Sequence, residues 1–297
     1  MVSDFSPDFV GIGAEKAATD WVAACLREHP EVCFSKHKEL AFFCELDQHF
    51  LKVPYRQYQR GIQWYERQFR HCPAEKVKGE YTPTYLYSRE VARRIHRHYP
   101  DAKLLVCLRD PVRRAFSQYL HDTRIGLIRG ISFEQALAQH HSYVEKGLYS
   151  KYLSHYLEFF PSSNMLLLLV EDIKADKRAV VRALYQFLGL NDSGFVPPSL
   201  DTTPNAASRA PLSWLNYVLI HAEYFLRERR LDFLLNLLED TGLRRAAVVF
   251  GCRTNRRPLA PYPPMQEDTE KRLRGEFAQD IDGLEKLLNR DLSHWKP

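Results

Sequence analysis

One stretch of this chain decides its fold: Phe9-Val-Gly-Ile-Gly-Ala-Glu-Lys16-Ala-Ala-Thr19-Asp-Trp-Val22. It consists of a short apolar run, a turn of small residues with one lysine, and then a helical pattern. A loop that leaves a strand and opens a helix directs several backbone N–H groups at one point, where the helix dipole also favours negative charge. The stretch therefore predicts an anion site suited to phosphate or sulfate.

The spacing of this loop separates it from the common nucleoside-triphosphate loop. That loop needs Gly-x4-Gly-Lys-Ser/Thr, whereas this chain has Gly13-Ala-Glu-Lys16-Ala-Ala-Thr19. The alternative for this loop on its own is an ordinary strand-to-helix turn with a solvated lysine. A second anion site is needed to decide between the two interpretations.

That second site lies about ninety residues further along the chain. Lys103–Leu108 has the continuous apolar pattern of a buried parallel strand and runs into Arg109-Asp-Pro-Val-Arg-Arg-Ala-Phe-Ser117. Asp110 suits a helix N-cap and the proline after it the first helical position. Arg109 and Ser117 could then hold one phosphate at a strand end. The alternatives are an ion-paired Arg109 and a Ser117 that bonds its own helix backbone.

Together the two segments resemble the sulfotransferase superfamily, which uses 3′-phosphoadenosine 5′-phosphosulfate (PAPS), and in particular its heparan sulfate N- and 3-O-sulfotransferase branch and related bacterial enzymes. Lys16-x-x-Thr19 resembles the 5′-phosphosulfate loop, and Arg109 to Ser117 resembles the 3′-phosphate motif. Arg253 to Arg257 resembles the loop that closes over the 3′-phosphate, with a solvated basic loop as the alternative. The resemblance implies cofactor contacts from Glu15, Lys16, Ala17, Ala18, Thr19, Asp20, Trp21, Arg109, Ser117, Tyr149, Arg256 and Arg257.

The resemblance also implies catalytic roles. Lys16 would stabilise the leaving adenosine 3′,5′-bisphosphate (PAP) during in-line transfer, a reaction in which positioning and charge stabilisation dominate. Glu39, in Lys38-Glu-Leu-Ala-Phe-Phe43, matches the catalytic glutamate and would be the general base. His121 could share that role, or be a packed structural histidine. A solvated Glu39 is the alternative without the resemblance.

No metal is required by this chemistry, and the histidines lack a convincing set of zinc-binding neighbours. Glu80, Tyr81 and Phe43 are the candidate acceptor contacts, the first two within a Gly79 to Tyr85 stretch that resembles a family motif. Tyr81 stands where many relatives have lysine, and Ala17-Ala18 where they usually have a glycine. We expect a carbohydrate or small-molecule natural-product acceptor. A P-loop-type small-molecule kinase and a catalytically inert nucleotide-binding homologue are the alternatives.

Composition sets further bounds on this chain of 297 residues, which is 45% hydrophobic and carries a net charge of +5. Such a charge suits anionic ligands without indicating nucleic acid, and the oligomeric state cannot be read from it. Six cysteines without a Cys-x-x-Cys pair favour free thiols in a reducing cytosol. The N-terminal residues have no signal-peptide pattern, and the longest aliphatic block, Met165 to Val170, is too short to cross a bilayer. The sequence therefore predicts a cytoplasmic protein without stable membrane association.

The pattern along the chain predicts a three-layer α/β fold whose central sheet is mostly parallel and flanked by helices. We expect one domain over residues 1–297, with a core at about 8–190 and a C-terminal helical and lid region at about 191–297. A helix is expected from Leu212 to about Leu238, and another whose apolar residues include Leu273, Phe277 and Leu284. The strands are predicted at Phe9–Ile12, Val32–Phe34, Val77–Tyr81, Lys103–Leu108 and Met165–Val170.

Overall fold

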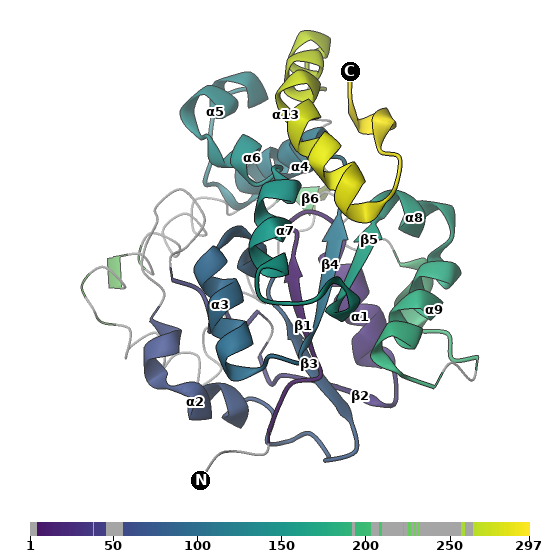
Figure 1. Ribbon diagram of the computed structural model, residues 1–297. Helices are drawn as coiled ribbons and strands as arrows, with labels where there is room; N and C mark the ends of the chain where they lie inside the picture. The colour runs from purple at the N-terminus through teal and green to yellow at the C-terminus, as the bar shows by residue number, and fades with distance from the viewer. Residues whose placement is uncertain are drawn as a thin grey trace.

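The computed structural model describes residues 5–37, 39–45, 56–191, 194–202, 208–209, 257–258 and 264–297, with isolated positions between 222 and 231. Its centre is a five-stranded parallel sheet with the strand order β2-β3-β1-β4-β5 (Figure 1). The predicted α/β class and parallel sheet are confirmed. The strands are β1 (Phe9–Gly13), β2 (Val32–Phe34), β3 (Val77–Tyr81), β4 (Lys103–Leu108) and β5 (Met165–Leu169).

The direction of the crossovers decides which helices cover which face of the sheet. The chain moves from β1 to β2 in one direction across the sheet and from β3 to β4 in the other. Because parallel crossovers are right-handed, α1 (Thr19–Glu28) and α3 (Arg89–His98) lie on opposite faces. β1 and β4 are neighbours whose following helices diverge, which is where open α/β sheets bind ligands.

The remaining helices complete the two outer layers. On the α3 face, α7 contacts both α3 and α13, and α13 crosses over α7 and α4 near the C-terminus (Figure 1). The predicted last helix is confirmed, since Leu273, Phe277 and Leu284 of α13 are fully buried. The helices not yet given are α2 (Ile62–Arg67), α4 (Pro111–Ile125), α5 (Phe133–Gln139), α6 (Ser142–Glu145), α7 (Tyr149–Leu157), α8 (Val170–Ala175), α9 (Lys177–Leu188) and α13 (Glu267–Leu288).

Short elements connect these layers. The 3-10 helices are η1 (Gln57–Arg60), η2 (Pro83–Tyr87), η3 (Ser162–Asn164), η4 (Pro198–Asp201) and η5 (Ser293–Trp295). A small antiparallel pair joins β6 (Ser208–Arg209) to β7 (Arg257–Pro258). The predicted helix from Leu212 to Leu238 lies outside the described residues, apart from isolated positions.

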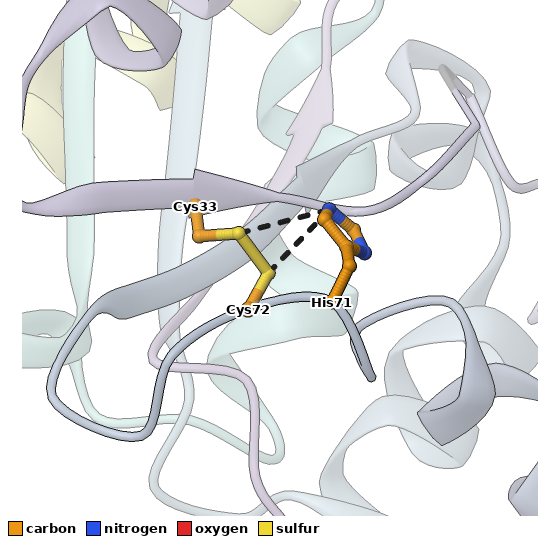
Figure 2. A group of neighbouring side chains, drawn as sticks. All are labelled: Cys33, His71 and Cys72. Carbon is orange, nitrogen blue, oxygen red and sulfur yellow. Dashed lines mark hydrogen bonds between the residues drawn. A yellow bond between two sulfur atoms is a disulfide. The ribbon is translucent and has the colours of Figure 1, made fainter.

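A disulfide contradicts the expectation of free thiols. Cys33 of the edge strand β2 is bonded to Cys72, which follows α2 (Figure 2). Two cysteines 39 positions apart without a Cys-x-x-Cys spacing gave no sequence signal for this pair. Cys25, Cys44 and Cys107 are buried and take no part in a disulfide, as expected. The disulfide removes the cysteine argument for a reducing compartment, and location in the cytosol stays a prediction.

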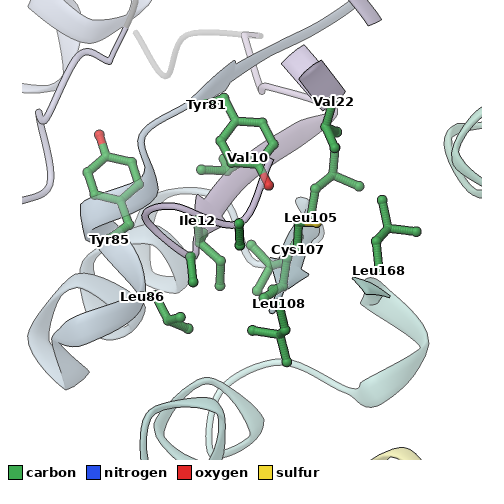
Figure 3. Close-up of a cluster of buried hydrophobic side chains, with 14 of the residues drawn as sticks. Val10, Ile12, Val22, Tyr81, Tyr85, Leu86, Leu105, Cys107, Leu108 and Leu168 are labelled. Carbon is green, nitrogen blue, oxygen red and sulfur yellow. The ribbon is translucent and has the colours of Figure 1, made fainter. Parts of the chain in front are cut away.

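The core lies between the sheet and its helices. Val10 and Ile12 of β1, Leu105 of β4 and Leu86 of η2 are completely buried and pack in one cluster (Figure 3). This continuous apolar character is typical of parallel strands covered on both faces. Within the described part of the chain, the structure has no helix that is both long and apolar enough to cross a membrane.

Candidate active site at the carboxyl ends of β1 and β4

The loop after β1 is held in place by its own backbone. The N–H of Ala14 donates to the carbonyl oxygen of Cys107 in β4 at 2.7 Å, and Ala18 caps α1 by accepting from the N–H of Trp21 at 3.0 Å. Lys16 and Ala18 have φ angles of 66° and 60°. This left-handed conformation is one that glycine adopts without strain. The loop therefore keeps its shape although the glycine usual in the resembled family is absent.

Lys16 is a half-buried cation at the centre of this loop. Burial lowers the pKa of its ammonium group, whereas the charges of Glu15, Asp122 and Asp20 act to raise it. Among the described residues, no carboxylate forms an ion pair with Lys16, although the carboxylates named here influence it from further away. A partly desolvated cation without a paired anion is a group that an anionic ligand would stabilise.

Arg109 leaves the end of β4 and reaches the same loop. Its Nη1 atom donates to the carbonyl oxygen of Lys16 at 3.3 Å, and the hydroxyl of Tyr149 donates to the carbonyl oxygen of Arg109 at 2.9 Å. Burial lowers the pKa of the Arg109 guanidinium. Within the described chain no carboxylate forms an ion pair with it, so the ion-paired alternative is not observed there. The structure thus brings the two predicted anion turns together.

The helix α4 brings further groups toward Lys16. Asp110 caps this helix by accepting from the backbone N–H of Val112 at 2.8 Å, as its sequence position predicts. Ser117 is half-buried in the second turn. Further along the helix, Arg124 Nη2 lies 2.8 Å from Nδ1 of His121, and the charge of Arg124 adds to burial in lowering the pKa of Lys16. Lys16, Arg109 and Arg124 give this edge of the sheet a concentration of positive charge.

Comparison with known proteins identifies the family to which this chain belongs. The model of the sulfotransferase family matches residues 7–194, which is more than half of the chain and includes both anion turns. The chain belongs to the sulfotransferase family.

Several known sulfotransferases are similar to this family member. It is 33% identical over 193 residues to human heparan sulfate glucosamine 3-O-sulfotransferase 6, a match that covers 62% of this chain and 52% of that one. It is 27% identical over 203 residues to human bifunctional heparan sulfate N-deacetylase/N-sulfotransferase 2, with 63% and 22% covered. The chain thus spans about half the length, or less, of these relatives.

A solved structure is similar over almost the whole chain. The crystal structure of a sulfotransferase from Alicyclobacillus acidocaldarius superposes with a TM-score of 0.70 at 26% identity, covering 98% of this chain and 99% of the other. The predicted resemblance to the sulfotransferases, including the heparan sulfate branch and bacterial enzymes, is confirmed by these matches.

The segment with the predicted base follows β2. Glu39 is exposed, and it adopts the left-handed conformation with a φ of 54°, as does Ala41 with a φ of 48°. The backbone N–H of Ala41 donates to Oγ1 of Thr82 at 3.4 Å, and that of Phe43 donates to the hydroxyl of Tyr85 at 3.4 Å. The segment with Glu39 therefore rests on the turn that follows β3.

Glu80 lies beneath that segment and is completely buried. Its carboxylate accepts from Thr82 Oγ1 at 2.6 Å and from the Tyr85 hydroxyl at 2.9 Å, and the backbone N–H of Leu40 also donates to it. Burial raises the pKa of Glu80 to about 7, although these hydrogen bonds act to lower it. Glu80 supports the Glu39 segment from inside, and an acceptor contact from its side chain stays a prediction.

Tyr81 and Phe43, the other predicted acceptor contacts, are also in the interior. The Tyr81 hydroxyl donates to the carbonyl oxygen of Gly13 at 2.9 Å. Its ring crosses β1 at Gly11, where a Cβ atom on that residue would lie only 2.3 Å from a ring carbon, so this tyrosine depends on that glycine. Phe43 is fully buried among aromatic rings. The tyrosine that replaces the usual lysine therefore supports the first anion loop from below.

Glu15 is held by a partner that the sequence did not reveal. Its Oε2 atom lies 2.5 Å from Nζ of Lys146, whose side chain is almost fully buried, and its backbone N–H donates to the hydroxyl of Tyr87 at 3.1 Å. Lys146 also lies 5.2 Å from the Tyr87 ring centre. Lys146 directly precedes the Gly147-Leu-Tyr149 stretch, but its spacing gives no sign of an ion pair 131 positions away.

Most of the other predicted cofactor contacts lie in the loop after β1 and in the first turn of α1. Ala17 is fully buried, Thr19 is the first residue of α1, and Trp21 Nε1 donates to the carbonyl oxygen of Leu200 at 3.2 Å. Asp20 is half-buried in the first turn of α1. Arg256 lies outside the described residues, and Arg257 belongs to β7. The roles of all these residues in binding stay predictions.

Proposed function

We propose that this chain transfers the sulfuryl group from PAPS to a hydroxyl or amine of a carbohydrate acceptor. The observation that supports this most strongly is the meeting of Lys16 and Arg109 at the carboxyl ends of adjacent strands, without a carboxylate paired to either among the described residues. A donor with phosphate at one end and phosphosulfate at the other needs two such cationic positions. The residues present therefore fit PAPS.

PAPS, when bound, supplies the activated sulfuryl group. In this proposal Lys16 neutralises the negative charge that develops on the departing PAP, and the N–H groups at the start of α1 bind sulfuryl oxygens. Arg109 and Ser117 bind the 3′-phosphate. Glu39 removes the proton of the acceptor. Because Glu39 is exposed, an acceptor molecule can reach it.

The acceptor class rests on the relatives. Two of them are named for heparan sulfate, one for O-sulfation and one for N-sulfation, so a sulfated or unsulfated glycan is the acceptor we propose. A small-molecule natural product would require the same donor site and a differently shaped acceptor surface. Transfer of label from ³⁵S-PAPS to a panel of heparan-type glycans and small alcohols or amines distinguishes these acceptors.

Two measurements test the donor. Calorimetry should show binding of PAP and weaker binding of ATP with Mg²⁺, and transfer should persist in the presence of a metal chelator. Lys16→Ala should lose most transfer, because no other ammonium of the loop could replace it. Preferential binding of ATP–Mg²⁺ would instead support a P-loop-type kinase. Binding of PAP without transfer to any acceptor would support an inert homologue.

A further inference from the structure

A compact group of sulfur and nitrogen atoms lies away from the donor site. Cys33 is in the edge strand β2, and His71 and Cys72 are in the turn after α2 (Figure 2). Nε2 of His71 lies 3.7 Å from the sulfur of Cys33 and 3.7 Å from that of Cys72. The three ligand atoms all lie within 4.8 Å of one another.

These distances are close to those of a zinc site. With Zn–S near 2.3 Å, Zn–N near 2.0–2.1 Å and tetrahedral angles, sulfur and nitrogen ligands lie about 3.6 Å apart, and two sulfur ligands about 3.8 Å apart. In the disulfide form, the histidine nitrogen therefore already lies about as far from each sulfur as two ligands of one zinc ion do. The two sulfurs, which are bonded to each other in the disulfide, would have to separate.

We propose that the dithiol form of Cys33 and Cys72, together with His71, binds one thiophilic divalent cation such as Zn²⁺. A dithiol or phosphine reductant first supplies two electrons, and two protons from water complete the two thiols. Binding of the cation then releases these two protons, because thiolates are the ligands. Three protein ligands leave the fourth position to water.

The position of this site suggests what the cation would hold together. Three residues after Cys33, the N–H of Lys36 donates to the carbonyl oxygen of Gln68 at 2.8 Å, so the chain that follows β2 already contacts the end of α2, just before His71. The disulfide links the same two segments. A bound cation would restore this link after reduction. The segment thus linked leads directly to Glu39.

Cobalt is a suitable probe, because thiolate ligands give Co²⁺ an intense near-ultraviolet charge-transfer band. The experiment uses the full chain with Cys252→Ser, since Cys252 lies outside the described residues, and keeps the buried Cys25, Cys44 and Cys107. The protein is reduced with a phosphine, freed of the reductant without air, and titrated with Co²⁺ and then Zn²⁺. We expect a band that saturates at one equivalent, is displaced by Zn²⁺, and is absent from the oxidised protein.

Two substitutions connect the band to these residues, and a third serves as the control. Cys33→Ser should abolish the band. His71→Ala should weaken binding of the cation by about 10-fold to 100-fold or more, because losing even a residue that only hydrogen-bonds to a metal ligand costs that much affinity. His141→Ala, another exposed histidine, is the matched control and should bind as the parent does. An absent band in the reduced parent, or an unchanged affinity in His71→Ala, would overturn the proposal. His71→Ala decides the question even if Cys33→Ser fails to fold, because the side chain of His71 is exposed.

Discussion

The guanidinium of Arg109 donates to the carbonyl oxygen of Lys16 at 3.3 Å, although the two residues lie 93 positions apart in the chain. The contact exists because β1 and β4 are parallel neighbours that end at the same edge of the sheet. It holds the Arg109 guanidinium against the backbone of the loop that carries Lys16, the other cation proposed to bind the donor. A change at either residue should therefore affect donor binding before it affects the fold.

Arg109→Ala should weaken PAP binding by about 1–3 kcal/mol, a factor of roughly 5 to 150, because a charge-assisted hydrogen bond to a phosphate is lost. Calorimetric titration with PAP measures the change. Arg113→Ala is the matched control, since Arg113 is an exposed arginine of α4 that pairs with Glu270 at 3.0 Å. Equal PAP affinities of the two variants would remove Arg109 from the donor site.

Glu39→Gln should lower kcat by a factor of about 10²–10⁴, the usual contribution of a general base, while PAP affinity stays nearly unchanged. Initial rates of label transfer and PAP titration provide the two values. Glu75→Gln, an exposed glutamate before β3, is the control and should retain full activity. If Glu39→Gln were fully active across the pH range, the base role would pass to His121, the half-buried histidine on α4.

The fold was predictable because its signals are local. Continuous apolar runs identify parallel strands, and the strand at Lys103–Leu108 has the predicted bounds. Asp110 and Pro111 begin α4 as an N-cap and a first helical residue do. Gly189 ends α9 with a φ of 75°, as a C-cap glycine. Each of these features depends on a few neighbouring residues, so the sequence alone contains it.

The support beneath the site was not predictable, because it depends on contacts between distant segments. Tertiary packing buries Glu80 completely under the Glu39 segment, and no local pattern in the sequence indicates that burial. The Glu15–Lys146 pair and the Cys33–Cys72 disulfide each join residues far apart in the chain. Neither has a spacing signature, so only the three-dimensional arrangement identifies them.

Stability should depend on pH through Glu80. Its pKa is raised to about 7 in the folded state from an ordinary value of 4.5, so between these pH values the folded protein holds a proton that the unfolded chain releases. This contribution to stability is complete below about pH 4.5 and is lost as the pH rises to about 7.

Glu80→Gln cannot titrate, so the parent should lose stability relative to this variant as the pH rises from 5 to 7. The change should approach about 1.4 kcal/mol per pH unit, and the difference should level off above pH 8. Urea unfolding of both proteins at several pH values measures it. A difference in the free energy of unfolding that stayed constant from pH 5 to 8 would contradict the raised pKa.

Lys146→Met should destabilise the protein by about 3–5 kcal/mol, because it removes the buried ammonium group that pairs with the Glu15 carboxylate. The Glu15 and Lys146 side chains are only 11% and 5% exposed. The double variant Glu15→Gln, Lys146→Met should recover much of this loss, since no buried charge remains. Lys151→Met, at an exposed lysine of α7, should change little. Urea unfolding of the parent, of these three variants and of Glu15→Gln alone tests this, and a double variant that loses as much stability as the two single variants together would argue against the pairing.

Ala18→Gly should raise the free energy of unfolding by up to about 1 kcal/mol. A non-glycine residue in the left-handed conformation, here with a φ of 60°, costs about 1–2 kcal/mol, and the greater freedom of glycine in the unfolded chain offsets part of the gain. Ala17→Gly is the matched control one residue earlier. Ala17 is fully buried and has no positive φ, so this change should destabilise by about 0.5–1 kcal/mol. If Ala18→Gly and Ala17→Gly lowered the free energy of unfolding equally, the backbone of Ala18 would carry no strain. The loop would then gain no stability from a glycine at this position.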